Sequence, residues 1–221
     1  MARQRFRRKD LKRPDEFVSR GRAVIVWARD NMQTLSWAGA GFAVLLVAVA
    51  GFFSLRAARV RQANEDLAQA LMAFQTARYA EAAGQLAGVA ERWQATPVGR
   101  IAALYAAEAE AKANNLDAAS NRLRDVLASG EPTPYLKQQA LVDLGSILEH
   151  KGDFTGAAEQ FAQAAAAEGP YTANAILGEA RCRELAGEKD KARSLYERFA
   201  QEFSQAPEIE VVQAKIAALK G

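Results

Sequence analysis

Short blocks of apolar residues alternate with polar residues through most of the chain, at the spacing of amphipathic helices. Alanine, the strongest helix former, supplies many of the apolar positions, and β-branched runs are scarce outside residues 44–49. All prolines except Pro14 fall between the alanine-rich blocks, where they separate helices without breaking them. The pattern therefore predicts an all-α fold.

One pattern recurs four times, and each copy can be aligned on a single alanine. These anchor alanines are Ala82, Ala119, Ala157 and Ala192, which lie 35–38 residues apart. A glycine or alanine stands twelve residues before each anchor, and a leucine, phenylalanine or tyrosine stands four residues after it. These flanking residues are Ala70, Ala107, Gly145 and Ala180 before the anchors, and Leu86, Leu123, Phe161 and Tyr196 after them.

Each copy has the composition of two helices joined by a tight turn. Small residues are needed where two helix backbones cross closely, and large residues on one face of the second helix fill the space around the crossing. The turns carry glycine or asparagine at 114–115, 152–153 and 187–188, which are residues that tolerate a left-handed backbone. We therefore expect four helix pairs, at about 62–97, 98–132, 134–169 and 171–206.

The segment from Leu144 to Ala164 resembles a tetratricopeptide repeat (TPR), and residues 187–207 are a second good match. The two earlier units depart from that pattern, because Ala70 and Ala107 replace the usual glycine. The resemblance implies an α-solenoid of about four TPR-like helix pairs. Residues 207–220 are expected to form the capping helix that such a solenoid needs.

An uncharged stretch of 21 residues, 35–55, precedes the repeats. It is long enough to cross a hydrocarbon core of about 30 Å as a helix. Trp37 and Phe52 stand near its ends, as interfacial aromatic residues do, and arginines follow it. Because the polar lead before it is longer than that of a cleaved signal peptide, we expect an uncleaved transmembrane helix at 35–55 and a repeat domain at 56–221.

Residues 1–34 hold ten lysines and arginines against four acids, whereas residues 56–221 carry 19 basic and 22 acidic side chains. The basic tail favours a cytoplasmic N-terminus, so the repeat domain would be periplasmic, on an inner membrane crossed once. Residues 14–31 are expected to form an amphipathic helix that contacts anionic lipid, the alternative being a solvated tail. The mildly acidic main domain gives no reason to expect a nucleic-acid partner.

The sequence contains no catalytic constellation, and an enzyme is not expected. Cys182 is the single cysteine and His150 the single histidine, so the sequence predicts no metal site, and no motif predicts a cofactor. His150 is interpreted as a residue at a helix C-terminus, and Glu149 as a solvated acid beside it.

In TPR solenoids the first helix of each pair lines a concave groove, and the resemblance assigns ten candidate partner-binding residues to that groove. They are Leu67, Leu71, Phe74, Ile101, Leu104, Glu108, Val142, Ser146, Leu177 and Arg181. An apolar helix or an extended peptide would fit such a surface. The alternative is that these apolar residues pack neighbouring helices or mediate self-association, so a homo-oligomer remains open.

A short basic N-terminus, one span and a small solenoid of degenerate repeats together resemble the ancillary Sec translocon subunit family of bacterial inner membranes. That resemblance implies a protein–protein interaction scaffold whose partners are the translocon and a periplasmic chaperone. The alternative is a scaffold subunit of another envelope machine, for secretion, pilus or cell-division assembly.

Overall fold

The structure, a computed structural model, describes residues 16–129, 133–167 and 169–220. Within these residues the chain forms ten helices and no strand, which confirms the all-α prediction. The basic residues of 1–15 lie outside the described residues. In chain order the helices are α1 (Glu16–Asp30), α2 (Met32–Gln75), α3 (Tyr79–Arg92), α4 (Pro97–Lys112), α5 (Leu116–Ala128), α6 (Pro134–His150), α7 (Phe154–Ala165), α8 (Thr172–Leu185), α9 (Lys189–Glu202) and α10 (Ile209–Ala218).

The chain divides into two units, residues 1–59 and 60–221. In the first unit, the large apolar side chains from residue 21 of α1 to the beginning of α2 are exposed, among them Trp27, Trp37 and Phe53. The apolar part of α2 is long enough to cross a membrane, and none of it is buried. A helix of this composition exposes far more apolar surface than a soluble fold leaves uncovered.

The uncharged segment and the first helix of the repeats form one helix, α2, of 44 residues. The sequence analysis predicted them as separate elements. No proline occurs between residues 35 and 75, and the last glycine before α3 is Gly51. Because good helix formers such as alanine, arginine, leucine and glutamine make up most of residues 52–75, nothing in this stretch ends a helix.

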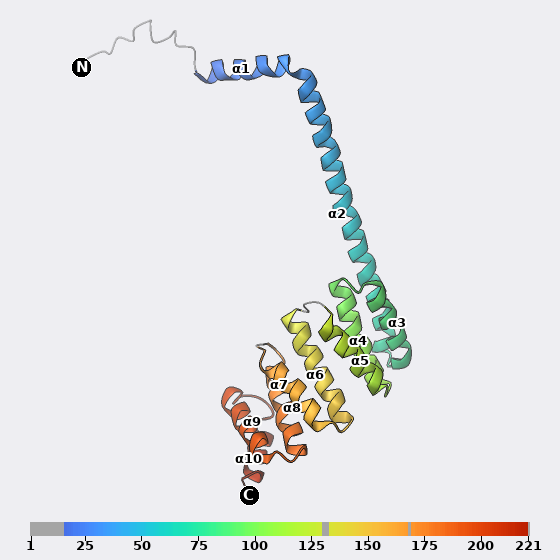
Figure 1. The fold of residues 1–221 in the computed structure, drawn as a ribbon, viewed down its shortest axis with the longest axis vertical. Helices are drawn as coiled ribbons and strands as arrows, with labels where there is room; N and C mark the ends of the chain where they lie inside the picture. The colour runs from blue at the N-terminus through green and yellow to red at the C-terminus, as the bar shows by residue number, and fades with distance from the viewer. Residues whose placement is uncertain (1–15, 130–132, 168, 221) are drawn as a thin grey trace, which may run out of the picture. The chain divides into compact units, whose positions relative to one another are not determined.

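The second unit consists of consecutive antiparallel helix pairs followed by α10 (Figure 1). Within the pairs α4 packs on α5, α6 on α7 and α8 on α9. The first helices of successive pairs also contact one another, α4 with α6 and α6 with α8. These first helices therefore form a continuous row.

The repeat spacing found in the sequence corresponds to the packing of the helix pairs. All four anchor alanines, Ala82, Ala119, Ala157 and Ala192, are 0% exposed. Proline stands at the first turn of α4 and of α6, preceded by Thr96 and Thr133, whose side chains accept hydrogen bonds from helix backbone N–H groups. The capping helix α10 buries Val212 and packs on α9, as predicted for the end of a solenoid.

The turn inside each pair has the same backbone geometry. The residue with positive φ is Ala77, Asn114, Gly152 or Gly187. In each turn the following residue donates its N–H to a carbonyl five residues earlier, as Asp153 does to Leu148 at 2.9 Å. This is the Schellman arrangement, in which a left-handed residue ends the first helix.

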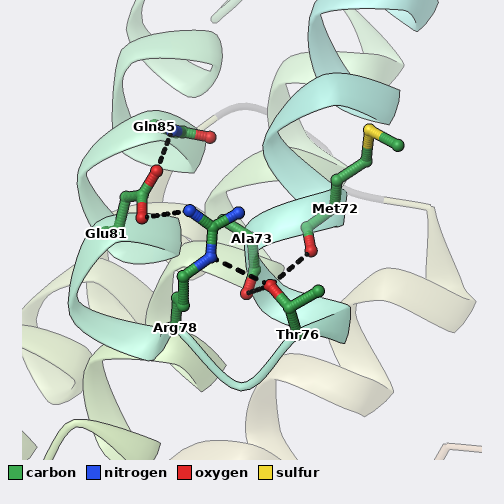
Figure 2. A network of polar contacts seen from close by, with 6 residues as sticks. All are labelled: Met72, Ala73, Thr76, Arg78, Glu81 and Gln85. Carbon is green, nitrogen blue, oxygen red and sulfur yellow. Dashed lines mark hydrogen bonds and ion pairs between the residues drawn. The ribbon is translucent and has the colours of Figure 1, made fainter.

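The first of these turns is reinforced by side chains (Figure 2). The Thr76 hydroxyl donates to the backbone carbonyls of Met72 and Ala73, and Arg78 Nε donates to Thr76 Oγ1 at 3.0 Å. The Arg78 guanidinium also binds Glu81 at 2.8 Å. The network fixes the turn in which Ala77, at φ 57°, must adopt a conformation that costs an alanine about 1–2 kcal/mol.

We therefore expect Ala77→Gly to raise the free energy of unfolding by about 1 kcal/mol, because glycine adopts this φ without a steric cost. The matched change in the opposite direction is Gly152→Ala, at φ 80° and with open space around its Cβ position, which should lower it by a similar amount. Urea denaturation of the full chain in mild detergent measures both. Equal effects of the same sign would contradict the argument.

Candidate functional site

A pocket of about 470 Å³ opens between the first helices of the second and third pairs. Its walls come mainly from α4 and α6, and its remaining residues come from α5 and the α4–α5 turn. The lining residues are Glu108, Ala111, Lys112, Asn114, Leu116, Leu123, Asp143, Ser146, Ile147 and His150. We call this the α4–α6 pocket.

Helical spacing explains why the polar residues of the pocket lie together. Glu108 and Lys112 are one turn apart on α4, and Asp143, Ser146 and His150 recur at steps of three and four on α6. Because α4 and α6 contact each other, the two rows form one surface. Apolar residues from the same helices and from α5 complete the walls.

Asp143 is the least expected residue in this pocket. Its carboxylate is largely buried, and it forms no hydrogen bond or ion pair with any residue that the structure describes. Burial, and to a smaller extent the negative charge of Glu108, raise the pKa of Asp143 to about 7. The pocket therefore holds a largely buried carboxylate without a partner among the described residues.

A pair of tyrosines, Tyr135 and Tyr171, lies within reach of the Asp143 charge. The hydroxyls of Tyr135 and Tyr171 form a hydrogen bond of 3.1 Å, and the ring centroids are 5.6 Å apart. That hydrogen bond, with burial and the charges of Asp143 and Tyr105, raises the pKa of Tyr171 to about 12. Asp143 therefore lies close enough to Tyr171 for its charge to act on that hydroxyl.

The positive charge nearest the pocket is already engaged. Lys112 Nζ lies 3.6 Å from Glu108 Oε1 and also over two aromatic rings, 5.6 Å from the centroid of Tyr79 and 6.0 Å from that of Phe74. These are distances at which an ammonium is attracted to a ring face. Lys112 therefore partly offsets the negative charge of Glu108 but is not paired with Asp143.

An ion pair joins α6 and α8, the first helices of the third and fourth pairs. Arg181 donates to both carboxylate oxygens of Glu149, at 2.5 and 2.6 Å. This bidentate contact raises the pKa of the Arg181 guanidinium. The interpretation of Glu149 as a solvated acid is wrong, and the predicted groove residue Arg181 is held by a residue of the same chain.

A second hollow, of about 570 Å³, lies between α2 and α3. Its charged side chains have partners. Asp66 accepts hydrogen bonds from Arg92 and from the Trp93 indole, and these bonds lower the pKa of its carboxyl group. Arg78 binds Glu81. This hollow offers a ligand no uncompensated charge, so the α4–α6 pocket is the better candidate site.

The structure corrects one of the predicted groove residues. Leu104 is only 4% exposed and belongs to the core around Ala140 and Leu144 of α6. Because the side chains of this core cluster cover Leu104, it cannot contact a partner directly.

The other apolar groove residues are half-buried. They pack at the edges of the core clusters, as the alternative interpretation expected: Leu67, Leu71, Phe74, Ile101, Val142 and Leu177. Glu108 and Ser146 are the two predicted groove residues that line the α4–α6 pocket. His150 is the last residue of α6, as predicted, and lies at the edge of the same pocket.

Sequence reasoning missed Asp143 and the three tyrosines. Groove positions were taken from a regular solenoid, and none of these four residues occupies one of them. A signal was present, because Asp143 interrupts the apolar run from Ala140 to Leu144 on a helix that faces other helices. An isolated charge in such a run indicates burial or a site, not a solvated face.

Cys182 is 0% exposed, and burial raises the pKa of its thiol to about 12, with a smaller contribution from the charge of Glu149. Since the thiolate is the reactive form, we expect no reaction with maleimide in the folded chain and full reaction after denaturation. Mass spectrometry of the labelled chain measures this. Rapid modification without denaturant would contradict the position of Cys182 in the core.

Comparison with known proteins is consistent with this architecture. A family model described as a tetratricopeptide repeat-like domain matches residues 26–221. No curated protein matches the chain in sequence. Among solved structures, the kinesin light chain TPR-like repeats from Podosopora anserina are similar, with a TM-score of 0.58 and 18% identity over 71% of this chain and 84% of that one.

A tetratricopeptide repeat protein from Parabacteroides merdae is also similar, with a TM-score of 0.61 and 11% identity. The match covers 72% of this chain and 60% of that one. At such identities the two structures support the fold and carry no information about particular partners.

Proposed function

Because the chain belongs to the tetratricopeptide repeat-like family, whose repeats are scaffolds for protein–protein interaction, we propose that it binds a partner protein across the row formed by α4, α6 and α8. The observation that carries the proposal is the α4–α6 pocket, in which a buried carboxylate has no partner among the described residues. Solenoids bind through such extended inner surfaces.

We further propose that the scaffold is anchored in the inner membrane and presents its repeats to the periplasm, where it assists protein translocation at the Sec translocon or recruits a periplasmic chaperone. The uncharged and exposed part of α2 supports the anchor. The basic tail supports the orientation. A scaffold in another envelope machine, for secretion, pilus or cell-division assembly, is the competing proposal.

Site-specific photocrosslinking in cells tests both proposals. A benzophenone amino acid placed at Ser146, in the pocket, should capture a defined partner, and the same residue at the exposed Gln163 on α7 should not. Translocon or chaperone subunits among the captured proteins would support the first proposal, and subunits of another envelope machine the second. No captured protein, or the same proteins from both positions, would contradict a partner in this groove.

Orientation needs a separate test, because Cys182 is buried and cannot report it. In a Cys182→Ser chain that also carries Gln163→Cys, we expect a membrane-impermeant maleimide to label intact cells once the outer membrane is permeabilised. Labelling only after the inner membrane is opened would place the repeats in the cytoplasm and remove the translocon proposal.

A further inference from the structure

We propose that the α4–α6 pocket binds a cationic side chain, lysine or arginine, of the partner polypeptide, with Asp143 and Glu108 as its counter-charges. The inference rests on the proposed function and adds the chemistry of the partner. A partner without a positive charge at this position would gain nothing from the two carboxylates.

Charge is the first argument. Asp143 and Glu108 line one pocket, and the Glu108 charge acts on Asp143. Lys112 lies close to Glu108 and to two aromatic rings. One lysine does not balance the two carboxylates, so the pocket has an excess of negative charge. A buried carboxylate is ordinarily paired, and a cation from a partner would supply the missing charge.

The aromatic surroundings are the second argument. Tyr105 and Tyr135 are 36% and 50% exposed, and Tyr171 lies against Tyr135. The Asp143 charge acts on Tyr171, and exposed tyrosine faces attract ammonium and guanidinium groups because the ring face carries negative charge. The side-chain stem of lysine or arginine would in turn cover apolar wall residues such as Ile147 and Leu123.

Size and ligand number favour a side chain over a bare metal ion. The pocket volume of about 470 Å³ is within the range of about 300–1,000 Å³ of small-ligand sites. Calcium binds six to eight oxygens. Among the described residues, no group of three or more acidic, histidine or cysteine side chains could hold a metal ion.

Two matched peptides test the inference with the full chain in detergent. Both are short, capped and fluorescent, with serine and alanine around a single variable residue. The first carries lysine there, and the second carries norleucine, which has the same stem without the amine. We expect the lysine peptide to bind at least about tenfold more tightly, measured by fluorescence anisotropy.

Variants locate the effect. Asp143→Asn and Glu108→Gln should each reduce affinity for the lysine peptide several-fold and leave that for the norleucine peptide unchanged. Asp125→Asn, at an exposed position on α5, is the matched control and should change neither affinity. Carbodiimide should join the peptide lysine to Asp143 or Glu108, and mass spectrometry should locate that bond.

Three results would overturn the inference: equal affinity for the two peptides, unchanged affinity in Asp143→Asn, or competition by calcium at the concentration that fills a metal site. These results are distinct from a failure of the proposed function. If Ser146 captures a partner in cells while the peptides are not distinguished, the scaffold function stands and the cationic chemistry is wrong. If no partner is captured, the scaffold function itself fails.

Discussion

Replacing Phe161 with alanine is expected to lower the free energy of unfolding by about 3–5 kcal/mol, the range for a large aromatic residue removed from a core. Phe161 is 2% exposed and lies four residues after Ala157 on α7. Its ring contacts Gly145 of α6 and Gly178 of α8, so it fills space shared by two helix pairs. Urea denaturation of the full chain, followed by helix content, measures the loss.

Glycine at 178 can be tested by a matched pair of substitutions. A Cβ atom built on Gly178 would lie 2.7 Å from the Phe161 ring, so Gly178→Ala should destabilise the chain by about 1–3 kcal/mol. Gly88 on α3 has open space around it, so Gly88→Ala should stabilise the chain by up to about 1 kcal/mol through helix propensity alone. If both substitutions stabilised the chain, the Phe161 ring would have to be able to move away from residue 178.

A double substitution checks the contact itself. Phe161→Leu removes ring atoms from the position that the new Cβ would occupy, so Gly178→Ala should cost less in that background than in the native one. The difference between the two costs is the coupling energy. A coupling energy near zero would contradict direct contact between residues 161 and 178.

Phe161 was identified in the sequence because its role is local and repeated. The anchor Ala157 and the turn residue Gly152 recur at fixed offsets in other copies. A repeated requirement, such as small residues at a helix crossing or a left-handed turn, leaves a repeated signal. Ala77 shows the limit, because it lies five residues before its anchor, as Gly152 does, yet alanine gives no sign of a positive φ.

The pocket was harder to predict because its properties depend on neighbouring units. Leu104 and Val142 occupy the same position in successive copies, yet Leu104 is core and Val142 is half-buried. The difference comes from the side chains that neighbouring units pack around each position, which the sequence of one unit does not contain. The burial of Asp143 could not be predicted for the same reason, since it requires α6 to pack beside α4 of the preceding unit.

Replacing Asp143 with asparagine is expected to stabilise the chain at pH 8, by no more than about 4 kcal/mol. The folded pKa of Asp143, about 7, is above its ordinary value of 3.8 because burial disfavours the charge. Between these two pH values the folded state holds a proton that the unfolded state releases. The contribution of protonated Asp143 to native stability is therefore complete below pH 4, is lost as pH rises toward 7, and is absent above it.

Asparagine does not titrate, so the stability difference between the variant and the native chain should be small at pH 4, grow toward pH 7 and then level off. Glu108, Lys112 and His150 line the same pocket in both chains, so the comparison isolates the change at residue 143. Asp125→Asn, at its exposed position, should show no such growth. Urea denaturation across this pH range measures the curve.

The direction of this effect separates a binding role for Asp143 from a structural one. A residue that supports the fold loses both stability and binding when it is replaced. A buried carboxylate kept for a partner's cation should instead give a more stable chain that binds the lysine peptide less well. If Asp143→Asn lowers stability at pH 8, the carboxylate is already satisfied within the fold, and the charge argument for the α4–α6 pocket is lost.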